Sequence, residues 1–204
     1  MQKVLLLALL LVSLTASDAC FPDTPWGNGP KGTSRNQWWC SSYSGFLGFS
    51  YPVEDDYCND YSYDGFKWDF NRQKTEYGAK FVRLYLPVCR KTSFWVSMIK
   101  AARDTSVGLI PMIFWDWQQN DGLMYEAENA FLGVFSDSEV GSIASYIIHS
   151  VAFGDELGEQ GDYWLGPMAD FKAKLAAHGV PITISDDWDR GVYQNKNGLT
   201  DFGK

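Results

Sequence analysis

The 204-residue sequence is short of basic charge and of side chains that bind transition metals. Its 17 Lys and Arg residues are outnumbered by 25 Asp and Glu, and Lys and Arg form no long run, which argues against an electrostatic nucleic-acid binder. The two histidines, His149 and His178, stand apart, and there is no Cys-x-x-Cys pair. We therefore expect no metal centre, no cofactor and no nucleic-acid partner.

Long apolar runs are also scarce, and the one at residues 4–12 is shorter than the roughly 20 residues that span a bilayer. Lys3 precedes this run, and small residues suited to cleavage follow it: Ala16, Ser17 and Ala19. This pattern predicts a signal peptide at residues 1–19. We expect a secreted, monomeric protein that has no membrane attachment after cleavage.

The sequence contains four cysteines: Cys20, Cys40, Cys58 and Cys89. In an oxidising compartment an even number predicts disulfides, and four cysteines allow three connectivities. We favour Cys20–Cys40 with Cys58–Cys89, because the second bond would join the segment after the first predicted strand to the end of the second. The cysteine content is too low for a small disulfide-scaffolded effector, so that alternative ranks last.

Residues 20–44 are rich in Gly, Pro, Ser and Trp and have no periodicity, so we expect an N-terminal extension before a domain at 45–204. Short apolar strands then alternate with amphipathic helices. Strands are predicted at 45–51, 81–86, 109–115, 150–153 and 180–185. Helices are predicted at 64–78, with Phe66, Phe70 and Tyr77 inward, at 93–103, after a Ser136/Glu139 capping box, and along Met168, Phe171 and Leu175.

This alternation is typical of an α/β fold with a parallel sheet. No Gly-x-Gly-x-x-Gly follows a predicted strand, which argues against a dinucleotide-binding sheet. We therefore predict an incomplete (β/α)8 TIM barrel with about five βα units.

Polar functional residues of such barrels lie at the carboxyl ends of the strands. Four consecutive predicted strands end in an aromatic residue or a carboxylate: Tyr85, Trp115-Asp116, Asp155-Glu156 and Asp186-Asp187. Glycosidic bond cleavage usually needs two carboxyl groups, and an apolar cleft raises the pKa of a Glu that donates a proton. Glu156 after Gly154 fits that role, although Glu159 and Asp162 nearby fit a solvated acidic loop equally well.

Three segments in order resemble glycoside hydrolase family 17, the fungal and plant β-1,3-glucanase group that includes cell-wall glucanosyltransferases. They are Phe81-Val82-Arg83-Leu84-Tyr85 with Cys89 after it, Phe114-Trp115-Asp116, and Val151-Ala152-Phe153-Gly154-Asp155-Glu156. The similarity covers residues 45–190. The resemblance implies a TIM barrel, an extracellular or cell-wall location, a β-glucan partner and a retaining mechanism.

The resemblance also assigns roles to individual residues. It implies that Glu156 is the acid/base and that Tyr85 and Asp155 contact the sugar in the −1 subsite. Trp115 and Asp116 would line the cleft beside it, and Trp188 is a stacking candidate from its position after the fifth strand.

The sequence departs from the family at two points. Asp155 replaces an Asn of the family, and an ionised Asp accepts hydrogen bonds but does not donate them. The family's nucleophilic Glu ends a seventh strand, whereas the predicted strands here stop at five, with Asp186 and Asp187 as the local substitutes. We therefore expect a fragment that is inactive as given, and the alternative is an inactive secreted protein that binds glucan or a host partner.

Overall fold

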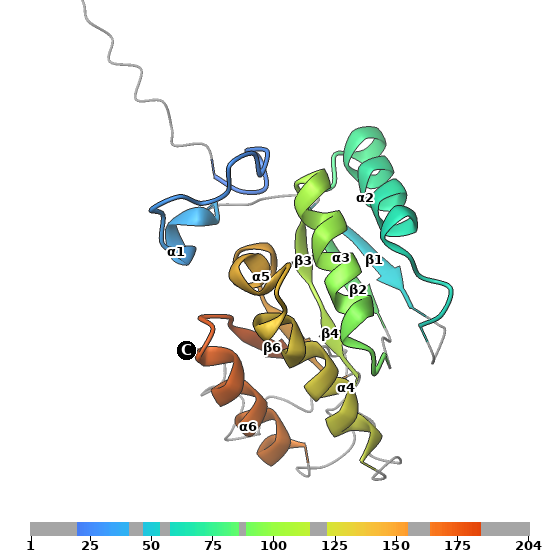
Figure 1. Cartoon of the computed structure of the whole chain (residues 1–204), viewed down its shortest axis with the longest axis vertical. Coiled ribbons are helices and arrows are strands. Elements are labelled where there is room, and N and C mark those ends of the chain that lie inside the picture. Colours follow the sequence, from blue (N-terminus) through green and yellow to red (C-terminus); the bar gives the residue numbers. More distant parts are fainter. Residues whose placement is uncertain are drawn as a thin grey trace, which may run out of the picture.

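The computed structural model describes residues 20–40, 47–53, 58–85, 89–114, 122–154 and 164–184. These residues form an α/β structure in which parallel strands lie against a layer of helices (Figure 1). The predicted signal peptide at 1–19 and the predicted boundary at residue 44 lie outside the described residues.

The strands are β1 (Gly48–Pro52), β2 (Phe81–Tyr85), β3 (Gly108–Ile110), β4 (Met112–Ile113), β5 (Val151–Phe153) and β6 (Ile182–Ile184). They pair in parallel as β1-β2-β3 and β4-β5-β6. The five predicted strands are therefore confirmed, with the third divided at Pro111 into β3 and β4.

The two sheets are connected through this divided strand. The backbone N–H of His149 donates to the carbonyl of Leu109, and that of Ala152 donates to Pro111, each at 2.8 Å. The strand order therefore follows the chain order along the described residues, with no reversal of the kind that defines a doubly wound sheet.

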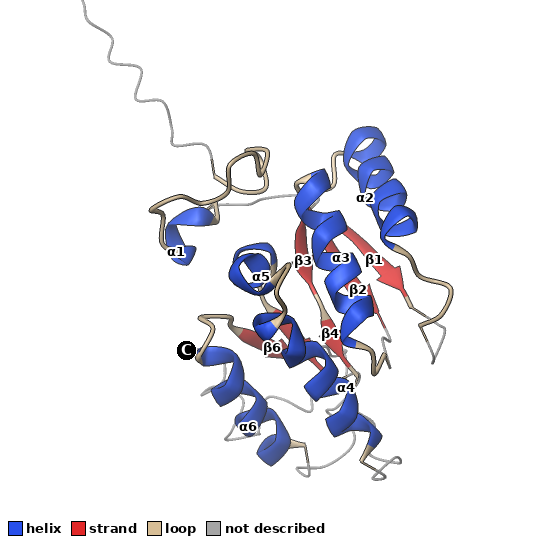
Figure 2. Cartoon of the chain, viewed as in Figure 1, coloured by secondary structure: helices blue, strands red, loops and turns tan. Residues whose placement is uncertain are grey.

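The helices that follow the strands are α2 (Tyr63–Tyr77), α3 (Thr92–Thr105), α4 (Leu123–Leu132) with the 3₁₀ turn η1 (Gly133–Ser136), α5 (Gly141–Ile147) and α6 (Leu165–Ala176). Figure 2 shows them in front of the strands. Apolar side chains fill the space between the layers, among them the predicted stripe of Met168, Phe171 and Leu175 on α6. None of the helices in the described ranges has the length and apolar character needed to cross a membrane.

Two local predictions are wrong. Ser136 is not a helix cap, because it ends η1; the side chain of Asp137 instead accepts from the backbone N–H groups of Glu139 and Val140 at 2.8 and 3.0 Å. Tyr77 is 53% exposed rather than inward, since it occupies the last position of α2, where its ring meets Phe49 of β1 edge-on.

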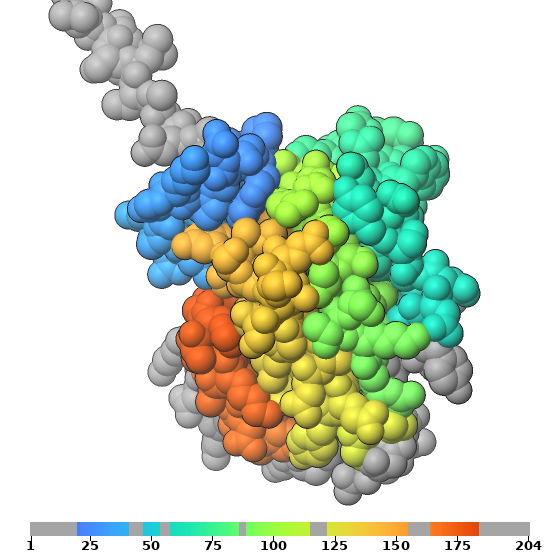
Figure 3. Space-filling view, viewed as in Figure 1, coloured from blue at the N-terminus to red at the C-terminus, as the bar shows by residue number. Residues whose placement is uncertain are grey.

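Residues 20–40, which we call the N-terminal strap, cover the amino ends of the strands. Trp39 stacks on Phe81, the first residue of β2, with ring centroids 5.7 Å apart, and meets His149 edge-on at 5.0 Å. Phe21 is fully buried against Trp38 and Trp39. Figure 3 shows the strap, in blue, lying against the green and orange surfaces of the helical layer.

Polar contacts fix the strap to α5. The guanidinium of Arg35 donates to the carbonyl oxygens of Ser145 at 2.7 Å, Ile148 at 2.8 Å and His149. Carbonyl groups at a helix C-terminus have no partner within the helix, so Arg35 supplies donors that α5 itself lacks. Burial of this guanidinium lowers the pKa of Arg35 from its ordinary value.

The contact between the strap and His149 predicts a pH dependence of stability. Burial first, and the charge of Arg35 second, lower the pKa of His149 below its ordinary 6.5. Below pH 6.5 the unfolded chain takes up a proton that folded His149 resists, so stability falls as pH drops and is unaffected by this group above that range. We expect unfolding by urea, followed by Trp fluorescence, to show this loss between pH 7 and 5, with a slope of at most about 1.4 kcal/mol per pH unit.

In the variant His149→Gln the side chain at position 149 is neutral at every pH. This variant should therefore show a smaller change of stability with pH. His178→Gln is the matched control, because His178 stacks on Phe135 and its replacement should leave the contribution of His149 in place. An equal pH slope in the wild type and in His149→Gln would contradict the prediction.

Candidate glucan-binding edge of the sheet

The structure describes one of the predicted sugar-contacting residues, Tyr85. It is the last residue of β2, at the carboxyl edge of the sheet, and its side chain is 37% exposed. The other predicted site residues lie outside the described residues: Trp115, Asp116, Asp155, Glu156 and Trp188, with Asp186 and Asp187.

The strands that precede these residues end side by side. Ile113 of β4 pairs with Phe153 of β5, and the N–H of Gly154 donates to the carbonyl of Ile113 at 2.8 Å. In the sequence, Trp115-Asp116 and Asp155-Glu156 begin one residue after Phe114 and Gly154, respectively. The described residues just before these two pairs therefore lie at neighbouring positions of one edge of the sheet.

Gly154, the residue after β5, has a backbone conformation that favours glycine. Its φ of 67° lies in the left-handed region, which residues with a Cβ adopt at a cost. The backbone therefore changes direction at Gly154, directly after the last residue of β5, Phe153. In the sequence Asp155 and Glu156 follow Gly154.

Tyr85 projects from the face of the sheet opposite the helices. Tyr51 of β1 contacts Phe66 and Phe70 of α2, and its register partner Leu84 shares that helix-facing side. Successive side chains of a strand alternate between faces, so Arg83 and Tyr85 lie on the other face.

Arg83 connects three strands on this face. Its guanidinium donates to the hydroxyl of Ser50 on β1 at 3.3 Å and approaches the sulfur of Met112 on β4 at 3.8 Å. It also lies 5.7 Å from the ring centroid of Tyr85. Arg83 was not predicted to have a role in the site, although its position two residues before Tyr85 in a strand already places the two on one face.

Both predicted disulfides form, Cys20–Cys40 and Cys58–Cys89. Cys58 and Cys89 are buried and follow β1 and β2 in the chain, so their bond lies at the same edge as Tyr85. As expected, the Cys58–Cys89 bond joins the segment after the first strand to the segment after the second, and β1 and β2 are parallel neighbours.

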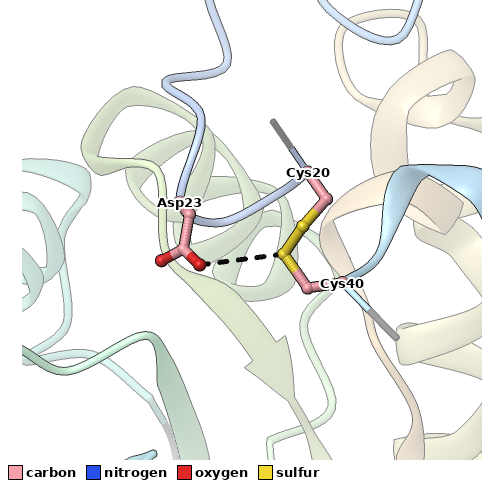
Figure 4. A group of neighbouring side chains, drawn as sticks. All are labelled: Cys20, Asp23 and Cys40. Carbon is pink, nitrogen blue, oxygen red and sulfur yellow. Dashed lines mark hydrogen bonds between the residues drawn. A yellow bond between two sulfur atoms is a disulfide. The ribbon is translucent and has the colours of Figure 1, made fainter. Parts of the chain in front are cut away.

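The Cys20–Cys40 disulfide lies in the strap, with Asp23 beside it (Figure 4). A carboxylate oxygen of Asp23 is 3.7 Å from the sulfur of Cys40, and the same carboxylate pairs with Lys80 at 2.7 Å. Thiolates are the metal-binding form of cysteine, and both sulfurs are bonded to each other. These three side chains therefore do not make a thiolate metal site in the oxidised protein.

Comparison with known proteins gives one informative match. No family model and no curated protein matches the sequence. Among solved structures, the chain is similar to an active-site mutant of a β-1,3-glucanosyltransferase from Rhizomucor miehei in complex with laminaritriose. The identity is 18% and the TM-score 0.53, over 71% of this chain and 51% of the other.

At this identity the likeness concerns the fold. The chain spans about half the length of the glucanosyltransferase, and its described residues share that protein's α/β arrangement. The predicted α/β class with parallel strands is confirmed, and the fold is similar to that of the glucanosyltransferase.

Proposed function

We propose that this chain is part of a secreted glycoside-hydrolase-like protein that binds and acts on β-1,3-glucan, with Glu156 as its acid/base. The observation that carries the proposal is the carboxyl edge of the sheet. Tyr85 lies there, and β4 and β5 end there side by side. Phe114 and Gly154, the last described residues after these strands, directly precede residues 115–116 and 155–156 in the sequence. The fold is similar to that of a protein solved with laminaritriose.

We further propose an incomplete (β/α)8 barrel related to glycoside hydrolase family 17. Consecutive parallel strands in chain order, with helices over one face, support this architecture. The two disulfides agree with an oxidising, extracellular location.

In the proposed mechanism two carboxyl groups act on one glycosidic bond. Glu156 would protonate the leaving oxygen while a second carboxylate attacks the anomeric carbon, and the resulting glycosyl-enzyme would pass its sugar to water or to another glucan. In this sequence Asp186 and Asp187, which follow β6, are the carboxylates considered for the second role. The sugar would be held by five further residues: Tyr85, Trp115, Asp116, Asp155 and Trp188.

The second candidate is a protein that binds β-1,3-glucan without cleaving it. Asp155 favours this alternative, because an ionised carboxylate accepts hydrogen bonds from sugar hydroxyls but cannot donate one, as the Asn of the family can. A second negative charge beside Glu156 would also raise the pKa of Glu156.

Retention on insoluble β-1,3-glucan and sugar release from laminarin separate these candidates. Retention together with release of reducing sugar supports the enzyme, and retention without product supports the binding protein. Cellulose serves as the control polysaccharide. If the protein is not retained on β-1,3-glucan and releases no product, the proposed function is contradicted.

A further inference from the structure

We propose that Arg83 is a positioning residue that holds the ring of Tyr85 in the orientation that binds glucan. This inference rests on the proposed function, since it assigns a role in the glucan site to a residue that would not itself touch the sugar. It is carried by the contacts of Arg83 with two other strands, β1 and β4, and with Tyr85 of its own strand β2.

The guanidinium is anchored independently of Tyr85. One of its nitrogens donates to Ser50 on one side of β2, and another contacts Met112 on the other side. An Arg side chain carries its donors in a planar, rigid fork, so two contacts on opposite sides restrict both the position and the tilt of that plane. The half-buried stem further limits its movement.

The anchored cation then acts on the Tyr85 ring. A guanidinium within about 6 Å of an aromatic centroid is attracted to the ring face, and the observed separation is 5.7 Å. Tyr85 is the last residue of β2, and its side chain is partly exposed. Arg83 therefore supplies a restraint at the point where the ring also reaches solvent.

The molecule contains a matched pair in a different setting. Arg72 lies 5.4 Å from the ring centroid of Trp68 on the outer side of α2, where Arg72 also forms an ion pair with Glu76. This pair has the same chemistry but lies on the helical layer, whereas Tyr85 lies on the opposite face of the sheet. Arg72→Met is therefore the control for removing an Arg from an aromatic ring.

The experiment compares Arg83→Met, Arg83→Lys and Arg72→Met in the full chain with ¹³C-labelled tyrosine. The Tyr85 ring signal is assigned by its loss in Tyr85→Phe, and laminaritriose affinity is measured by titration. Arg83→Met should shift or broaden the Tyr85 signal before any sugar is added and weaken laminaritriose binding about 3- to 10-fold. Arg83→Lys keeps the charge and should recover part of the loss, and Arg72→Met should change neither readout.

A double-mutant comparison tests whether Arg83 acts through the ring. In a Tyr85→Ala background, Arg83→Met should weaken binding no further. An unchanged Tyr85 signal in Arg83→Met, or an equal loss of affinity with and without the ring, would overturn the inference. A wild type that does not bind laminaritriose would overturn the proposed function and this role with it, whereas wild-type binding unaltered in Arg83→Met would overturn this role alone.

Discussion

Replacing Glu156 by Gln is expected to slow the release of sugar from laminarin by about 10²- to 10⁴-fold in an active protein that contains this chain. Gln has nearly the shape of Glu but no proton to give to the leaving oxygen, so the loss should fall on the chemical step. Glucan binding should change little, because shape and most contacts are kept.

The rate of reducing-sugar release, measured across pH, tests this expectation. In an active protein the limb of the profile on which the rate falls as the acid ionises should disappear in Glu156→Gln. Glu159→Gln is the matched control, as a second Glu of the same acidic stretch of sequence. Equal rates for the wild type and Glu156→Gln would remove Glu156 from the mechanism.

Removing the Cys58–Cys89 disulfide is expected to lower the free energy of unfolding by about 3.7 kcal/mol, the entropic value for closing a loop of 31 residues. The bond also ties the segments after β1 and β2 at the edge that carries Tyr85. The double variant Cys58→Ser/Cys89→Ser should therefore lose laminaritriose affinity as well as stability. Urea unfolding and titration below the transition measure the two effects.

The strap disulfide provides the control for this variant. Cys20→Ser/Cys40→Ser opens a loop of 20 residues, for which the same relation gives about 3.3 kcal/mol. This bond lies at the amino edge of the sheet, so its loss should reduce stability and leave sugar affinity unchanged. A stability loss under about 1 kcal/mol for the Cys58–Cys89 variant, or equal effects of both variants on affinity, would contradict the assignment.

The sequence predicted elements whose signal is local. The stripe of Met168, Phe171 and Leu175 repeats at helical spacing, and α2 ends at Tyr77 with Gly78, at a φ of 71°, as its C-terminal cap. Such patterns depend on a few neighbouring residues, so they survive in the folded chain. The pairing of Cys58 with Cys89 was also accessible, because it required only that β1 and β2 be neighbours.

Features that depend on distant residues were not predicted. Arg35 meets carbonyl groups 110 or more positions away on α5, and no periodicity within residues 20–40 indicates that partner. Arg83 was likewise not predicted as part of the site, because its contact with Met112 depends on how β4 is placed relative to β2 in the folded chain. The capping box at Ser136 failed since Asp137, one residue later, offers a competing acceptor.

Titration with laminaritriose tests the central claim, that the carboxyl edge of this sheet binds β-1,3-glucan. The wild type should bind saturably, and Tyr85→Ala should weaken binding about tenfold through loss of the ring surface. Tyr77→Ala, which removes an exposed ring from the end of α2, should bind like the wild type. Absence of wild-type binding, or equal affinities of wild type and Tyr85→Ala, would contradict the account.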